Sequence, residues 1–198
     1  MSILVILAHP TPGSFNHAIA ETVVSTLEQM GHAGFFHDLY AEAFDPVLPS
    51  EEILGDDLDP VLSEHCEQLT NAGGIVLVHP NWWGMPPAIL KGWVDRVVRP
   101  EVAYRFEEDD SGEGIPIGLL KAKAVVVFNT SNTPEMREQE AFGDPLERLW
   151  KDCIFDLCGV TEFHRRNFTV VVTSTEEERK GWLEEVEEIV GRVFEGDN

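Results

Sequence analysis

Short apolar segments recur along the chain, and polar turn residues follow them. Residues 3–8, 75–78 and 124–128 are continuous apolar runs, which are typical of strands buried on both faces of a parallel sheet. Residues 33–39 and 169–172 have a similar strand character and complete a set of five. The pattern therefore predicts five short strands.

In most of the segments between the predicted strands, apolar residues recur with the spacing of a helix. Apolar positions recur every three or four residues from Ile19 to Met30, and this segment ends at Gly31. The other predicted helices are residues 60–72, the segment that begins near Pro87, residues 145–157 and the segment from about residue 175. The predicted loops are residues 42–59, which hold one short helix, residues 101–118 and residues 129–134. The acidic stretch 107–113 inside the second loop is expected to be solvated.

Strands and helices alternate throughout, and this order favours a parallel sheet covered by helices on both faces. We therefore predict an α/β three-layer sandwich with a five-stranded parallel sheet in the flavodoxin-like order 2-1-3-4-5. This order is preferred here over the other doubly wound, nucleotide-binding order. No internal repeat or linker divides the sequence, so residues 1–198 are expected to form a single domain.

The net charge restricts the possible binding partners more than the overall composition does. The 198 residues include 36 acidic and 14 basic side chains, for a formal net charge of −22, while 43% are hydrophobic. That charge argues against partners that present a nucleic-acid backbone or an anionic lipid surface. An acidic surface poor in Lys is compatible with a high-salt cytoplasm, but the preferred interpretation is an ordinary soluble acidic protein.

The cysteines and the absence of membrane signals indicate a cytoplasmic protein. The three cysteines form no CxxC pair, which argues against a disulfide scaffold or a zinc site and fits a reducing compartment. Cys153 and Cys158 fall on a predicted apolar helix and are expected in the core. The first residues lack the basic region of a signal peptide, and no apolar run reaches the ~18 residues of a membrane span.

Three polar loops follow the first, third and fourth predicted strands, at residues 9–15, 79–86 and 129–134. In an open α/β sheet, ligands bind outside the carboxyl ends of the strands. The first loop offers hydroxyl groups and a helix N-terminus, which attracts an anion without Lys or Arg. The second offers Trp82 and Trp83, and the third offers short polar side chains. Together they suit a flavin.

Each of these residues also has a purely structural interpretation. Ser14 and Asn16 are common helix-capping types, and Trp82 and Trp83 are common core or interface aromatics. A lone His9 usually serves the structure, and the seven histidines lack metal-ligand spacing, so no metal site is predicted. The dinucleotide, P-loop, zincin and nucleophile-elbow motifs are absent from the sequence. The combination at three strand ends therefore carries the flavin hypothesis.

The same segments resemble a known family. AHPTPGSFN at residues 8–16 resembles the AHxxxxSFN segment of the NAD(P)H:quinone oxidoreductase (DT-diaphorase) family. PNWWGMPPAILKGW at residues 80–93 resembles that family's PxxWFGxPAILKGW signature. EVAYRF at residues 101–106 resembles the next family element, which lines the substrate pocket. The resemblance covers about residues 3–194.

The resemblance implies a flavoprotein, FAD or FMN, with NAD(P)H as co-substrate and a quinone-like acceptor. It places Tyr104 and Phe106 in the substrate pocket, Tyr104 closing it across the interface of a homodimer. Arg179 falls where FAD-binding relatives hold the adenine, which favours FAD over FMN. The implied flavin-binding residues are His9, Ser14, Phe15, Asn16, Pro80, Asn81, Trp82, Trp83, Asn129, Thr130, Ser131, Asn132 and Arg179.

The sequence departs from the vertebrate members of that family where they place a proton relay. Their Gly-rich loop is followed by a Tyr and a His, whereas this chain has Arg137 and Phe142 near those positions. The catalytic residue is therefore left open, with Arg137 as a candidate. Phe106 likewise replaces an aromatic residue that carries a hydroxyl group.

These observations favour a flavin-dependent NAD(P)H oxidoreductase that reduces quinones by ping-pong hydride transfer. A regulatory flavoprotein subunit of a potassium-efflux-type system and a flavodoxin-like electron carrier remain alternatives. The long segment 101–118 and Tyr104 fit an enzyme with a substrate cavity better than an exposed flavin edge.

Overall fold

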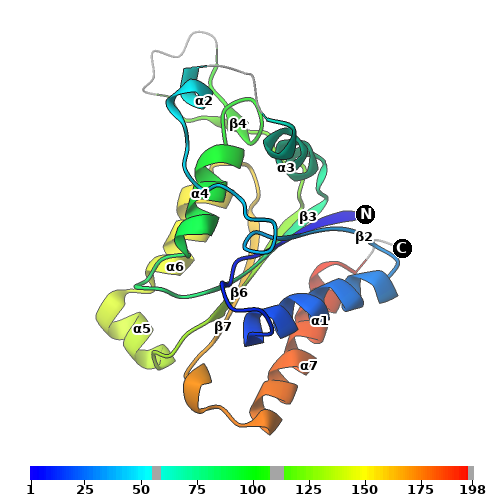
Figure 1. Ribbon diagram of the computed structural model, residues 1–198, viewed down its shortest axis with the longest axis vertical. Helices are drawn as coiled ribbons and strands as arrows, with labels where there is room; N and C mark the ends of the chain where they lie inside the picture. The colour runs from blue at the N-terminus through cyan, green and yellow to red at the C-terminus, as the bar shows by residue number, and fades with distance from the viewer. Residues whose placement is uncertain (55–58, 108–113, 196–198) are drawn as a thin grey trace.

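A five-stranded parallel sheet forms the centre of the computed structural model, which describes residues 1–54, 59–107 and 114–195 (Figure 1). The strand order is β2-β1-β3-β6-β7, which is 2-1-3-4-5 when the sheet strands are counted along the chain. The predicted fold is thereby confirmed. The strands are β1 (Ser2–Leu7), β2 (Ala33–Asp38), β3 (Gly74–Pro80), β6 (Ala124–Thr130) and β7 (Glu162–Phe168).

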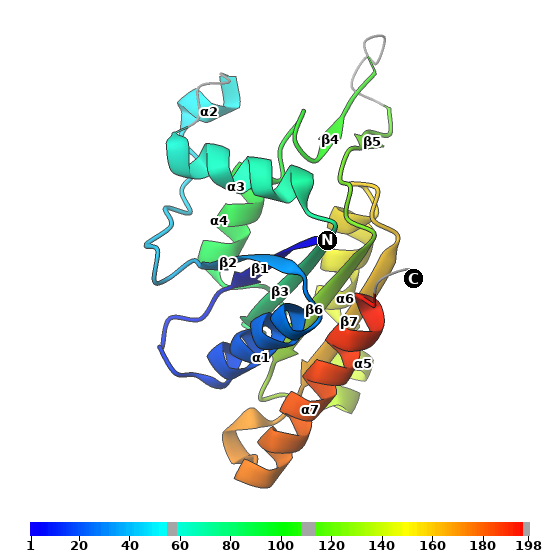
Figure 2. The same ribbon diagram turned by 90° about the vertical axis from the view of Figure 1, so that its right-hand side faces the viewer.

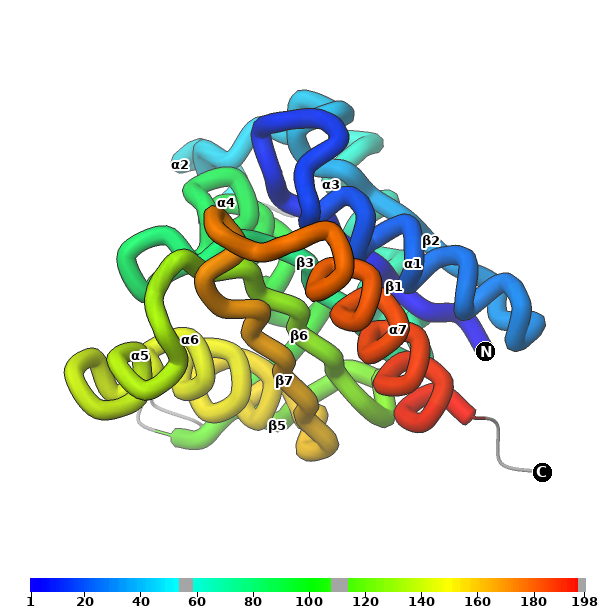
Figure 3. Tube along the Cα trace, turned by 90° about the horizontal axis from the view of Figure 1, so that it is seen from below, coloured from blue at the N-terminus to red at the C-terminus, as the bar shows by residue number. Residues whose placement is uncertain are grey.

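Helices cover both faces of the sheet (Figure 2). On one face, α1 (Phe15–Gln29) lies beside α7 (Glu176–Val193), as the view from below also shows (Figure 3). The other face is covered by α3 (Pro60–Asn71), α4 (Ala88–Val97) and α6 (Pro145–Arg148), and α6 continues into the π-helix η1 (Leu149–Phe155). The remaining elements are α2 (Ser50–Leu54), α5 (Glu135–Phe142), the 3₁₀ helix η2 (Val171–Thr173) and the short antiparallel pair β4 (Tyr104–Arg105) and β5 (Ile117–Gly118).

Alternation along the central strands divides the core into two layers. Leu4 and Ile6 of β1 pack under α3 and α4, whereas Ile3 and Val5 pack under α1 and α7. A strand buried on both faces favours apolar residues on both of them, and β1, β3 and β6 are apolar at most positions. Within the described ranges, no helix has the length and apolar character to cross a membrane.

The fifth strand lies earlier in the chain than the sequence pattern predicts. The predicted strand at 169–172 is wrong, because the chain there turns through Val170, which has a φ of 55°, into η2. The true edge strand β7 carries Arg165 and Arg166, whose charges are paired with Asp144 and Glu185. An edge strand does not need continuous apolar character, and apolar runs alone therefore miss it.

Other differences are smaller. The predicted loop at 129–134 begins inside β6, which extends to Thr130, and the sequence pattern misses α5. The helix predicted at 145–157 is present as α6 and η1. Cys158 is buried as expected, but Cys153 is exposed because it faces outward from η1. Most of the acidic stretch 107–113 lies outside the described residues.

Candidate functional site

A hollow of about 430 Å³ opens at the carboxyl ends of β1, β3 and β6. Parallel strands bring their carboxyl ends to one edge, so loops far apart in the chain meet there. All three predicted loops contribute to its wall, together with η2. The lining residues are His9, Ser14, Phe15, Asn16, Pro80, Asn81, Trp82, Thr130, Ser131, Asn132, Thr133, Val171 and Val172.

The N-terminus of α1 points into this hollow without a side-chain cap. Ser14 is the N-cap residue, yet its hydroxyl bonds His17 Nδ1 at 2.8 Å rather than a backbone amide of the first turn. Asn16 is buried and donates from Nδ2 to Thr130 Oγ1 at 2.9 Å, while its Oδ1 lacks a hydrogen-bond partner among the described residues. Uncapped amides and the helix dipole suit an anion, and Asn16 Oδ1 suits a donor.

His9 sits at the mouth of the hollow as a neutral group. Burial lowers its pKa below the ordinary value, although a hydrogen bond with the Thr11 backbone raises it in part. A protonated His9 is therefore not the source of positive charge at this edge. Attraction of an anion there depends on backbone amides and the dipole of α1.

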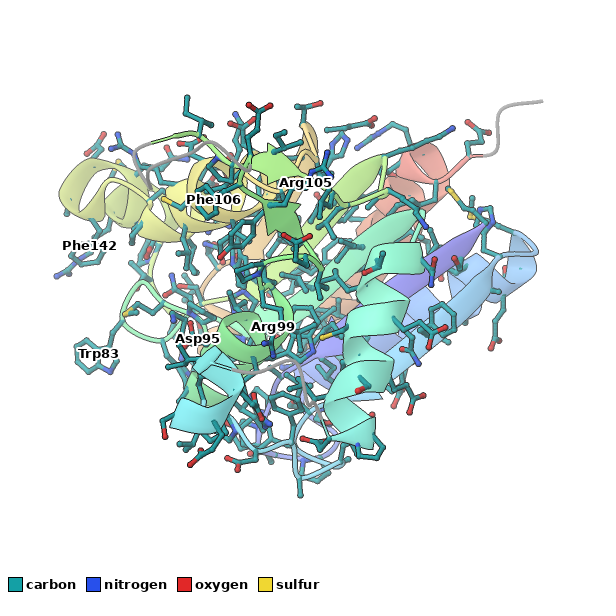
Figure 4. The ribbon with its side chains drawn as sticks, turned by 90° about the horizontal axis from the view of Figure 1, so that it is seen from above. Trp83, Asp95, Arg99, Arg105, Phe106 and Phe142 are labelled. Atoms are coloured by element: carbon teal, nitrogen blue, oxygen red, sulfur yellow. The ribbon has the colours of Figure 1, made fainter. Side chains whose placement is uncertain are left out.

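The two tryptophans belong to one two-residue hairpin turn, in which Trp82 is a flanking residue and Trp83 the first central residue. Trp82 and Met85 exchange both backbone hydrogen bonds, at 3.0 and 3.1 Å, and the central residues Trp83 and Gly84 have φ values of 60° and 74°. Positive φ at both central positions is the geometry of a type I′ turn. Trp82 consequently lines the hollow, whereas Trp83 is 100% exposed and projects outward (Figure 4).

A second hollow of about 570 Å³ lies on the other side of this turn. It shares Asn81, Asn132 and Thr133 with the first hollow, so the two adjoin. Asn81 lies at their boundary and is fixed by two hydrogen bonds. Its Oδ1 accepts from the Gly84 amide at 2.8 Å, and its Nδ2 donates to Glu138 at 2.9 Å. The other lining residues are Trp83, Gly84, Pro134, Arg137, Glu138, Phe142 and Pro145.

Asn129 lies beneath the hollows and does not line either of them. It is fully buried in β6, where Nδ2 donates to His79 Nε2 at 2.9 Å and Oδ1 accepts from Arg165 Nε at 2.7 Å. Arg165 in turn donates to Asp144 at 2.7 Å. Asn129 therefore fixes the strand ends from below rather than at the ring edge where the resemblance places it.

His79 is held in one neutral tautomer by the same network. Its Nδ1 faces the Pro80 carbonyl at 2.9 Å, and its Nε2 accepts from Trp150 Nε1 at 3.0 Å. The pKa of His79 is lowered to about 4, mainly by its complete burial and to a smaller extent by the charge of Arg165, against the opposing effect of the hydrogen bond with the Pro80 carbonyl. Sequence reasoning missed this role because a buried histidine after an apolar strand carries no motif.

Four further predicted residues lie outside the first hollow. Tyr104 and Phe106 line a separate hollow of about 400 Å³ with Cys153 and Leu157. Arg179 lies in the first turn of α7 and donates to Ser174 Oγ at 3.4 Å, just beyond η2. Trp83 lines the second hollow only. Val171 and Val172 were missed because the sequence pattern assigned them to a strand.

His37, Glu42 and His65 gather within 4.8 Å, a grouping that resembles a metal site. Trp93 Nε1 donates to His65 Nδ1 at 3.1 Å, and burial, followed by the charge of His37, lowers the pKa of His65 to about 4. The single proton of neutral His65 therefore resides on Nε2, which faces Glu42 at 3.7 Å. A protonated nitrogen is no metal ligand, and the Glu42 carboxylate is instead hydrogen-bonded to His37 Nδ1 at 2.9 Å.

Comparison with known proteins agrees with this architecture. Residues 1–190 match a family model described as flavodoxin-like fold. The chain is 33% identical to an uncharacterized NAD(P)H oxidoreductase of Haemophilus influenzae, over 93% of this chain and 91% of the relative. It is 26% identical to human ribosyldihydronicotinamide dehydrogenase [quinone], over 91% and 87% of the two chains.

A solved structure has a similar fold. NAD(P)H:quinone oxidoreductase from Methanothermobacter marburgensis superimposes with a TM-score of 0.84 at 23% identity, covering 100% of this chain and 99% of that one. At this identity the likeness establishes the arrangement of helices and strands alone. The conclusions about chemistry therefore depend on the hollows described above.

Proposed function

This chain belongs to the flavodoxin-like fold family, and we propose that it is a flavin-dependent NAD(P)H oxidoreductase that reduces quinones or similar flat acceptors. One observation carries the proposal: segments from three strand ends and η2 meet in a single hollow beside an uncapped helix N-terminus. The curated relatives named above are oxidoreductases, and the name of the human one gives a quinone as its acceptor.

The residues of the first hollow fit a flavin in charge and shape. The uncapped first turn of α1 would hold a phosphate, and the unpaired Asn16 Oδ1 would accept from a hydroxyl group of the bound molecule. Trp82 supplies a flat apolar wall, and Thr130 and Ser131 supply polar atoms opposite. We propose FAD rather than FMN because Arg179 lies just beyond η2, where it could contact the adenine nucleotide that FAD has and FMN lacks.

A bound flavin supplies what these side chains lack, namely acceptance of a hydride and return of two electrons. The overall reaction converts NAD(P)H, a quinone and one proton to NAD(P)⁺ and the hydroquinone. The hydride carries both electrons and one proton, and solvent supplies the second proton. Arg137 remains protonated and Phe142 has no exchangeable proton, so the part we propose for Arg137 is that of a fixed positive charge.

A homodimer would bring the predicted substrate-pocket residues to the flavin. Tyr104 and Phe106 lie in a hollow that shares no lining residue with the first two, so within one chain they do not reach the flavin hollow. A second copy of the chain is therefore part of the proposal. The mass of the native protein by light scattering tests it, and a monomer under turnover conditions would remove these residues from the site.

The function is tested by releasing the cofactor and by measuring turnover. The purified protein is denatured, and the supernatant is examined by absorption and mass spectrometry, which separates FAD, FMN and no flavin. Steady-state oxidation of NADH and NADPH is then measured with 1,4-naphthoquinone, with and without added flavin. Saturable turnover that depends on flavin supports the oxidoreductase. A bound flavin without quinone turnover would instead favour the regulatory subunit or the electron carrier.

A further inference from the structure

The second hollow has features that the binding of a flavin does not require. Building on the function proposed above, we propose that this hollow binds the acceptor, that it selects flat aromatic acceptors carrying a negative charge, and that Arg137 recognises this charge. The substrate class would then be anionic quinones and related aromatic anions.

The first wall is an aromatic ring held outward by a strained turn. Trp83 has a φ of 60°, a conformation that is unfavourable for a bulky residue. Gly84 is pressed against Pro145, and a Cβ atom on Gly84 would lie 2.6 Å from Pro145 Cγ. The hairpin is therefore fixed in place, and it leaves the indole of Trp83 100% exposed. Strain and exposure of this kind point to a ligand that covers the ring.

The lining holds a second aromatic residue besides Trp83. Phe142 at the end of α5 is 52% exposed, and it projects from the same flank of the molecule as Trp83 (Figure 4). Pro134 and Pro145 complete the apolar lining. A volume of about 570 Å³ lies within the roughly 300–1,000 Å³ of small-molecule pockets. Two aromatic residues in the lining favour a flat guest over an aliphatic one.

Arg137 places a positive charge at the rim of this hollow. Its guanidinium lies over the Phe142 ring at 5.6 Å from the centroid, and in the described part of the chain no carboxylate forms an ion pair with it. Arg96, Arg165 and Arg166 are each paired with at least one carboxylate, whereas Arg148, Arg179 and Arg192 resemble Arg137 in this respect but do not line the hollow. The molecule has a net charge of −22, so most of its surface repels anions. The guanidinium of Arg137, which has no acidic partner among the described residues, can therefore form an ion pair with an anionic ligand in the aromatic hollow.

Glu138 determines which way the ligand faces. Its carboxylate is buried at the inner wall, where it accepts from Asn81 Nδ2 at 2.9 Å. An anionic group is repelled from this inner position and attracted to Arg137 at the rim. The uncharged end of the acceptor therefore faces Asn81, which is also the boundary with the first hollow. This orientation directs the reducible end toward the proposed flavin.

A matched pair of unreactive ligands tests recognition without turnover. Naphthalene-2-sulfonate and naphthalene-2-sulfonamide have nearly the same shape and differ in charge. Titration calorimetry with the flavin-loaded protein is expected to give tighter binding of the sulfonate. Arg137→Gln should lower the ratio of the two affinities about 5- to 20-fold, and Arg137→Lys should give an intermediate ratio because the ammonium retains the charge. Arg192→Gln, on the exposed side of α7, removes the same charge elsewhere and should leave the ratio unchanged.

Turnover provides the second readout. The kcat/KM ratio for 1,4-naphthoquinone-2-sulfonate over 1,4-naphthoquinone should fall in Arg137→Gln by a similar factor, while the KM values for NADH and NADPH stay in the same ratio. A changed preference between NADH and NADPH would assign Arg137 to the dinucleotide phosphate and overturn the proposal. An unchanged sulfonate ratio in a folded, flavin-loaded variant would also overturn it, while the proposed function would stand. Absence of turnover with either quinone in the wild type would contradict both.

Discussion

His79 is a single residue on which the geometry of the strand ends depends. Its Nε2 accepts hydrogen bonds from Trp150 and Asn129, so a proton at this atom would face two donors in a fully buried site. Its pKa is about 4 in the folded protein, against 6.5 for the free side chain. The unfolded chain therefore binds the proton more strongly, and protonation favours unfolding.

This residue predicts how stability responds to acid. The free energy of unfolding should fall as the pH drops from about 6.5 to about 4, with His79 contributing up to about 1.4 kcal/mol per pH unit. Urea denaturation across this range measures the slope. His79→Gln should be less stable at neutral pH and should show a shallower slope. Equal slopes for His79→Gln and the wild type would contradict this account.

The two tryptophans are expected to act separately although they are adjacent. Trp82 lines the first hollow and Trp83 lines the second. Trp82→Ala should weaken flavin binding by roughly 1–3 kcal/mol, because it removes a large apolar contact from the proposed ring wall. Trp83→Ala should affect flavin affinity less. Fluorescence titration of the apoprotein with flavin measures both values. A folded Trp82→Ala protein that binds flavin as the wild type does would remove Trp82 from the ring wall.

At the scale of elements, α7 shows a strong local signal. Thr175 and Glu178 form a capping box, in which the Thr175 hydroxyl accepts from the Glu178 amide at 3.2 Å and the Glu178 carboxylate accepts from the Thr175 amide at 2.7 Å. Both partners are visible in the sequence at the expected spacing. The predicted start of this helix at about residue 175 is accordingly confirmed.

The capping box gives a stability prediction for this element. Thr175→Ala should lower the free energy of unfolding by about 1 kcal/mol, since the first-turn amide loses its acceptor. Thermal or urea denaturation measures the change. Ser63→Ala, an exposed hydroxyl deletion inside α3, provides a control that should change stability by less than half as much. If the two variants lose stability equally, the cap does not determine the start of α7.

Elements that are apolar on one or both faces could be predicted from sequence, whereas those that depend on distant partners could not. The strands β1, β3 and β6 are apolar at most positions, and their order followed from alternation with helices. β7 is polar at most positions because its two arginines form ion pairs with carboxylates from other elements. Arg165 pairs with Asp144 and Glu147 at the start of α6, and Arg166 pairs with Glu185 of α7. Within α5, Glu138 alone is buried, so no apolar stripe marks the helix.

The candidate site was predictable to a similar extent. The loops after β1, β3 and β6 meet as the strand order requires. The separation of Trp82 from Trp83 was not predictable, because it depends on positive φ at Trp83 and on the contact between Gly84 and Pro145. The hydrogen-bonding role of Asn129 was likewise not predictable, because its partner Arg165 comes from the strand that the pattern missed.

At the scale of the whole molecule, charge is the dominant feature. A net charge of −22 makes the compact state self-repelling, and salt screens this repulsion. The melting temperature should therefore rise clearly with KCl between about 0.01 and 1 M, where the Debye length falls from ~30 to ~3 Å. Tetramethylammonium chloride should give a similar rise if screening is the cause. A melting temperature indifferent to both salts would show that the charge matters for solubility alone.

The proposed function is tested most directly by following the absorbance of the bound flavin in a stopped-flow instrument without oxygen. Mixing the flavin-loaded protein with NADH or NADPH should bleach the flavin absorbance in a single turnover. Adding one equivalent of 1,4-naphthoquinone should then restore it, since the quinone takes up both electrons. A protein that retains no flavin, or whose flavin stays oxidised with both dinucleotides, would contradict the assignment of this hollow to an NAD(P)H oxidoreductase.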